Sequence, residues 1–137
     1  MLNNTKYKKL YKKKIKNFNF NLLVEGIMGI RVLESCRITL KQIEAIRRIF
    51  VRVTKREGRF FIRVQLNQSV TKKAKGSRMG KGVGSIDSWV IDVKPGQLLF
   101  EFTHLNDKSY AKFIEGIKGK IPAKIEIILK NIDINEL

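Results

Sequence analysis

The sequence has few of the residues that build metal centres and disulfide bonds. Its 137 residues include one cysteine, Cys36, and one histidine, His104. A lone cysteine excludes an internal disulfide and a cysteine-rich metal site, and a lone histidine excludes a histidine cluster. No apolar run approaches the roughly 20 residues that a membrane-spanning helix needs. We therefore expect neither a metal or other cofactor nor a membrane partner.

Acidic residues are also scarce. Asp and Glu number 12 against 29 Lys and Arg, which gives a formal net charge of +17. Such a charge opposes compaction unless a polyanion neutralises it, and the phosphates of nucleic acid are the strongest candidates. Anionic membranes and acidic proteins are weaker ones. The hydrophobic fraction of 43% nevertheless predicts a folded core, and the length predicts one domain.

The organisation that we predict is a basic N-terminal arm, residues 1–20, followed by a single domain, residues 21–137. The arm contains no acid, and aromatic residues alternate with its lysines. Self-repulsion should keep it extended until it binds RNA. A solvated tail is the alternative, and an organelle presequence a weaker one because the arm lacks arginine and serine. The lysines predicted to bind RNA are Lys6, Lys8, Lys9, Lys12, Lys13 and Lys14.

The pattern along the domain predicts an α+β fold, in which two helices pack on one face of a mainly antiparallel sheet. Thr39 and Gln42 form a capping box that opens a helix ending near Glu57, just before Gly58. A second helix follows Asn106 or Asp107 and ends near residue 118. The predicted strands lie within 22–33, 59–66, 88–93, 97–103 and 123–130. A Lys94-Pro95-Gly96 turn should join the third and fourth of these into a hairpin.

The first helix carries two stripes. Its apolar residues recur at helical spacing and should face the core; they are Ile43, Ile46, Phe50 and Val53. Its basic residues are predicted to face phosphates, although an ordinary solvated face is the alternative. Only Glu44 and Glu57 dilute them, which favours the first interpretation. The basic residues are Lys41, Arg47, Arg48, Arg52, Lys55 and Arg56.

The segment from Asn67 to Asp87 is predicted to be a long loop with little apolar content, and such loops are usually functional or disordered. It contains five cations, and Gly80, Gly82 and Gly84 allow its backbone to approach a ligand closely. The spacing fits neither the G-x-x-x-x-G-K-[ST] loop nor the G-x-G-x-x-G pattern. We therefore expect no enzyme and no small-molecule substrate.

Several motifs, in this order and spacing, resemble the bacterial-type large-subunit ribosomal protein number sixteen, the counterpart of the archaeal and eukaryotic ten-e family. The resemblance covers about residues 1–130, and Val83 departs from the lysine usual in the family's loop. The motifs are Arg37-Ile38-Thr39-Leu40-Lys41-Gln42-Ile43-Glu44-Ala45, Lys55-Arg56-Glu57-Gly58, Phe61-Ile62-Arg63 and Arg78-Met79-Gly80-Lys81-Gly82.

The resemblance implies a structural, non-catalytic protein of the large ribosomal subunit. Its implied partners are large-subunit rRNA, tRNA and neighbouring ribosomal proteins. By motif position, the glycine-rich loop would reach toward tRNA near the peptidyl-transferase centre, through Arg78, Met79, Gly80, Lys81 and Gly82. The rRNA contacts would include the arm lysines and helix cations above, together with Arg37, Arg63, Lys72 and Lys73.

Two questions stay open at the level of sequence. A free RNA-binding chaperone or regulator is the alternative function, because the same charge pattern would serve it. The heavy use of isoleucine, lysine and asparagine, without an evident presequence, favours a protein made inside an organelle. We predict a mitochondrial ribosome, with the bacterial cytoplasm and the plastid as alternatives.

Overall fold

The computed structural model describes residues 9, 14–15, 17–103 and 105–130. Two helices and seven strands form an α+β fold across these residues, which confirms the predicted class. All strand pairs are antiparallel. One sheet has the order β3-β6-β1-β7, formed by Phe60–Ile62, Leu98–Phe102, Met28–Val32 and Ile125–Leu129. The other has the order β2-β5-β4, formed by Cys36–Thr39, Ser85–Val93 and Gln68–Lys72.

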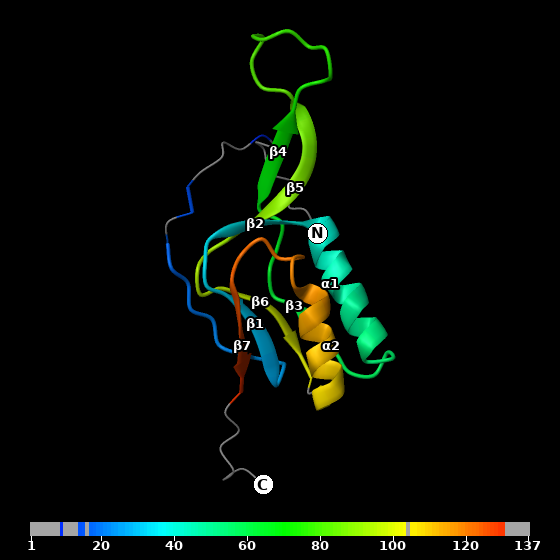
Figure 1. The fold of residues 1–137 in the computed structure, drawn as a ribbon. Helices are drawn as coiled ribbons and strands as arrows, with labels where there is room; N and C mark the ends of the chain where they lie inside the picture. The colour runs from blue at the N-terminus through cyan, green and yellow to red at the C-terminus, as the bar shows by residue number, and fades with distance from the viewer. Residues whose placement is uncertain (1–8, 10–13, 16, 104, 131–137) are drawn as a thin grey trace.

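Both helices pack on the same side of the four-stranded sheet, as predicted (Figure 1). The helices are α1, Leu40–Val53, and α2, Asp107–Ile117. They lie so close that a Cβ on Gly116 would stand 2.8 Å from Ile49. The Phe50 ring of α1 meets Phe113 of α2 and Phe102 of β6, with ring centroids 5.6 and 5.7 Å apart. These contacts fix α1 with its opposite, basic side facing outward.

The start of α1 is as predicted. The Gln42 backbone N–H donates to Thr39 Oγ1 at 3.3 Å, and the Thr39 N–H donates to Gln42 Oε1 at 2.8 Å. This capping box satisfies two of the donors that a helix start leaves free.

The end of α1 differs from the prediction, because the helix stops at Val53 and not near Glu57. Lys55 and Arg56 adopt φ values of +52° and +72°. Their N–H groups donate to the carbonyls of Arg52 and Val51, the two bonds of a Schellman motif. Lys55 thus takes the left-handed position that glycine usually holds. The prediction assigned that position to Gly58, three residues further along the chain.

The predictions of a single sheet and of a hairpin at Lys94-Pro95-Gly96 are both wrong. The turn exists: the Gln97 N–H donates to the Lys94 carbonyl at 3.1 Å, and Gly96 has φ +81°. However, β5 pairs with β2 and β4, whereas β6 pairs with β1 and β3. Every residue of β6 is buried, which suits a strand with a partner on both edges. Turn residues determine where the chain reverses, but they do not determine which strand becomes the neighbour.

The predicted long loop is also partly wrong. Its first residues form β4, and β5 begins at Ser85, so the loop proper spans 73–84. The strand predicted over 59–66 is reduced to β3, while β2 was not predicted. The strands expected within 22–33 and 123–130 are present as β1 and β7. Figure 1 shows β4 and β5 projecting away from the helices, with the loop at their far end.

Candidate nucleic-acid interface

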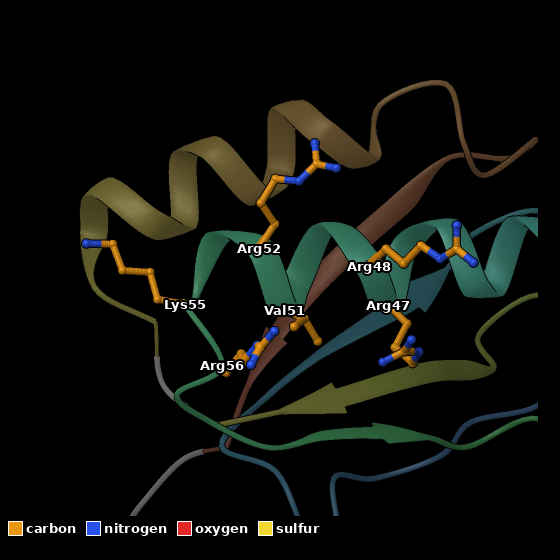
Figure 2. Close-up of a pocket in the computed structure, with 6 residues that line it drawn as sticks. All are labelled: Arg47, Arg48, Val51, Arg52, Lys55 and Arg56. Atoms are coloured by element: carbon orange, nitrogen blue, oxygen red, sulfur yellow. The ribbon is translucent and has the colours of Figure 1, made fainter.

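The outward side of α1 forms a shallow pocket of about 430 Å³ that is almost wholly cationic (Figure 2). Figure 2 shows Arg47 and Arg52 pointing to opposite sides of the helix, with Val51 between Arg47 and Arg56. Residues four apart on a helix lie about 6 Å apart along its axis. Arg48 and Arg52 are four apart within α1, so their charges are spaced to contact neighbouring phosphates of one strand. The lining residues are Arg47, Arg48, Val51, Arg52, Lys55 and Arg56.

One acid lies beside this pocket. Glu44 accepts hydrogen bonds from Arg47 Nε at 2.8 Å, from Arg47 Nη2 at 2.8 Å and from Arg48 Nε at 3.1 Å. These bonds lower the pKa of Glu44 to about 2, so the carboxylate is ionised at neutral pH. Because all three side chains are exposed, the pairs add little to the stability of the fold. Their effect is on where the two guanidinium groups lie.

The other end of the pocket is shaped by the backbone. Lys55 and Arg56 follow the helix in left-handed conformations, which are unfavourable for residues with a Cβ. The Schellman hydrogen bonds hold this turn, and both side chains line the pocket. Backbone strain of this kind often occurs at functional sites.

The remaining predicted rRNA contacts lie in two kinds of surroundings. Arg37 is ion-paired with Asp92 at 2.7 Å, and Arg63 lies 3.0 Å from Glu101, so acids within the protein already balance their charge. The other described residues of this predicted set are exposed lysines, namely Lys9, Lys14, Lys41, Lys72 and Lys73. Outside the described residues lie Lys6, Lys8, Lys12 and Lys13.

The loop over 73–84 presents the second cationic surface. The Lys73 Nζ donates to the Gly80 carbonyl at 2.6 Å, which ties the base of the loop to its tip. Gly80, Lys81 and Gly82 have φ values of +98°, +55° and +75°. No atom would touch a Cβ at either glycine, so conformation and not crowding requires them. Met79 at this tip is 96% exposed. The predicted tRNA-facing residues 78–82 therefore lie together at the end of the β4–β5 projection.

Two features of this interface were not predicted from the sequence. Glu44 is predicted only to dilute the basic stripe, although its spacing of three and four residues from Arg47 and Arg48 is that of helical ion pairs. The left-handed turn at Lys55 and Arg56 has no comparable signal in the sequence.

Two aromatic residues of the N-terminal arm, Phe18 and Phe20, lie within the part of the chain that the structure describes, and both are largely exposed.

Neither a metal site nor a membrane helix is found in the described part of the chain. No three Cys, His, Asp or Glu residues there gather as metal ligands would. None of the helices there has the length and apolar character to cross a membrane.

A strongly basic α+β protein that gathers exposed cations on one helix and one glycine-rich loop has the features of an RNA-binding protein. The chain belongs to the family of ribosomal protein L16p/L10e, whose model matches residues 2–128. This finding confirms the resemblance carried by the motifs.

Individual relatives match over nearly the whole chain. A large ribosomal subunit protein uL16c of Emiliania huxleyi is 39% identical over 126 residues, covering 90% of this chain and 91% of its own. A large ribosomal subunit protein uL16 of Erythrobacter litoralis (strain HTCC2594) is 38% identical over 140 residues, covering 97% and 94%. A uL16c protein of Stigeoclonium helveticum is 36% identical over 126 residues, covering 90% and 93%.

Proposed function

We propose that this chain is a structural protein of the large ribosomal subunit, that its α1 face binds rRNA phosphates, and that its β4–β5 loop reaches toward tRNA. The observation that carries the proposal is that five cations gather along the outward side of α1 and line one pocket. Among the described residues, Glu44 pairs with Arg47 and Arg48 beside the pocket, so one acid faces five cations and the surface keeps a net positive charge. Phosphate contacts of this kind fix the position of a protein on RNA and carry little sequence information.

The loop is suited to a different task. Its cations stand on a projection with no acid between Lys72 and Asp87, so it can enter a space that is already lined by phosphates. The left-handed residues at its tip, two of them glycines, let the backbone turn sharply there and come close to a ligand. We propose that Arg78 and Lys81 contact tRNA near the peptidyl-transferase centre. The protein is not an enzyme, because the rRNA carries out the chemistry.

The ribosome concerned is organellar or bacterial, in keeping with the uL16c and uL16 relatives. The mitochondrial compartment expected from composition has no support from these relatives and stays a prediction. Co-fractionation of the protein with mitochondrial, plastid or cytoplasmic large subunits would decide it.

The α1 face can be tested by retention on the ribosome. We expect a high-salt wash to remove at least tenfold more of the Arg48→Gln/Arg52→Gln variant than of the wild-type protein from large subunits. The reason is that several phosphate contacts are lost together. Lys108→Gln/Lys112→Gln removes the same charge from the exposed side of α2 and should stay bound. The measurement is the amount of protein that co-sediments with large subunits.

Two outcomes of this experiment would count against the proposal. Equal detachment of both variants would show that net charge, and not the α1 face, holds the protein. A wild-type protein found mostly off the subunit would instead favour the free chaperone.

A further inference from the structure

We infer that Glu44 is a positioning residue for RNA binding: its carboxylate holds the guanidinium groups of Arg47 and Arg48 in the arrangement that meets phosphate. The inference deepens the proposed function of the α1 face and rests on it. It assigns a favourable role in RNA binding to an acidic residue whose charge alone would repel phosphate.

The geometry of the three side chains supports this role. Both Glu44 oxygens engage Arg47, through Nε and Nη2 at 2.8 Å each, and Oε1 also reaches Arg48 Nε at 3.1 Å. A guanidinium group has five N–H donors in a rigid plane. Most donors of the two groups therefore stay outside these bonds. Arg47 is held along its Nε–Nη2 edge by two bonds and Arg48 at its Nε by one, and the remaining donors are left for a ligand.

Two opposing effects decide the sign of the contribution of Glu44. Its negative charge repels nearby phosphates, but salt screens this repulsion at an exposed site. The opposing effect is entropic. A free arginine loses conformational entropy when RNA immobilises it, which lowers affinity about two- to tenfold for each long side chain. An arginine that Glu44 already orders loses less. Because Glu44 hydrogen-bonds two arginines before RNA arrives, we expect positioning to outweigh repulsion.

The location of Glu44 agrees with this account. It lies on the same outward surface, where Leu40, Lys41, Ala45 and Arg48 line a second shallow pocket with it. Its carboxylate is ionised at neutral pH, as that of an ordinary glutamate is, and the bonds to the arginines lower its pKa further, to about 2. Its bonds to the arginines therefore persist across the physiological range.

The test measures binding of the full-length protein to a short fluorescein-labelled RNA duplex at several salt concentrations. We expect Glu44→Gln to weaken binding about three- to tenfold, although the variant is one unit more positive. Glu115→Gln is the matched control, because it removes an exposed acid from α2, and it should bind as well as wild type or better. Glu44→Asp keeps the charge but shortens the reach, so it should also weaken binding.

A double-variant background shows whether Glu44 acts through the arginines. In Arg47→Gln/Arg48→Gln, adding Glu44→Gln should leave affinity unchanged or raise it, because only repulsion is left to remove. A loss of the same size in both backgrounds, or no loss in either, overturns the inference.

The same data separate this inference from the function on which it rests. If Arg47→Gln/Arg48→Gln binds RNA as well as wild type, the proposed role of the α1 face fails. If that variant binds weakly but Glu44→Gln does not, only the inference about Glu44 fails. Circular dichroism of each variant verifies that α1 is intact.

Discussion

At the scale of single residues, Glu101 in β6 is a fully buried carboxylate. Its Oε2 accepts hydrogen bonds from the backbone N–H groups of Val24, Glu25 and Gly26 at 3.1, 2.7 and 2.8 Å. Its Oε1 lies 3.0 Å from Arg63 Nε. Burial raises the pKa of Glu101, but the three backbone donors and Arg63 outweigh burial and lower it. The ionised side chain thus anchors the segment before β1 to the sheet.

We expect Glu101→Gln to lower the free energy of unfolding by about 2–4 kcal/mol. An amide offers one acceptor oxygen in place of two, and it leaves Arg63 without its buried counter-charge. Urea denaturation at neutral pH measures the difference. Glu126→Gln is the control, because it removes a carboxylate that is exposed in its pair with Arg31, and it should cost at most about 1 kcal/mol. Equal losses in both variants would contradict this account of Glu101.

The same residue predicts how stability depends on pH. Because the folded-state pKa is lowered, the contribution of Glu101 is complete above the unfolded-state pKa of about 4.3. It is lost as the pH falls through the folded value. The stability gap between wild type and Glu101→Gln should therefore narrow below about pH 4, as measured by urea denaturation at a series of pH values. A gap that stays constant down to pH 2 would show that the charge of Glu101 is not what matters.

At the scale of elements, the end of α1 combines strain with charge. Lys55 has φ +52°, where a residue with a Cβ is disfavoured and glycine is not. We expect Lys55→Gly to be about 1 kcal/mol more stable than Lys55→Ala, although both lose the same cation. Thermal unfolding compares the two. Both variants should bind RNA more weakly than wild type and by the same amount, since each has lost the lysine in the pocket.

Two results would argue against this account of Lys55. If the alanine and glycine variants unfold together, the turn is not left-handed in solution. If both variants bind RNA as well as wild type, RNA binding does not explain why a lysine occupies this strained position.

The same helix shows which features can be read from the sequence. The capping box of Thr39 and Gln42 was predictable because it is local and its chemistry is specific. The basic stripe was predictable because helical periodicity alone groups its residues. The end at Val53 was not, because a lysine occupies the left-handed position and Gly58 gave a stronger but false signal.

The sheets show the complementary limit. The turn at Pro95 and Gly96 was found, yet its two strands belong to different sheets. Pairing depends on which edges are free once the core has formed, and that is a property of the whole fold. Similarly, β4 is too polar to alternate visibly, and it becomes a strand because β5 lies beside it.

At the scale of the whole molecule, the surplus charge is unevenly distributed over the described residues. On the sheets and their connections, acids balance cations in pairs such as Arg31–Glu126, Arg37–Asp92 and Lys124–Glu34. The outward face of α1 has only the Glu44 cluster. The loop over 73–84 has four cations and no acid. The protein therefore directs positive potential from two separate surfaces, and each can be altered without the other.

This separation predicts a division of labour. Arg78→Ala/Lys81→Ala should enter large subunits almost as well as wild type, because the proposed rRNA contacts of α1 are intact. Subunits carrying it should make peptide more slowly, since the proposed tRNA contact at the tip of the projection is lost. Arg48→Gln/Arg52→Gln should show the reverse, with poor incorporation but near-normal synthesis per incorporated protein.

The measurements are the number of copies of the protein per large subunit and the rate of peptide synthesis at matched occupancy. Each variant removes two cations, so a difference between them cannot come from net charge. It must come from where those cations stand, one pair on a helix packed against the core and the other at the tip of a hairpin. If both pairs reduce incorporation to the same extent, the loop is another rRNA anchor, and its reach toward tRNA is not its function.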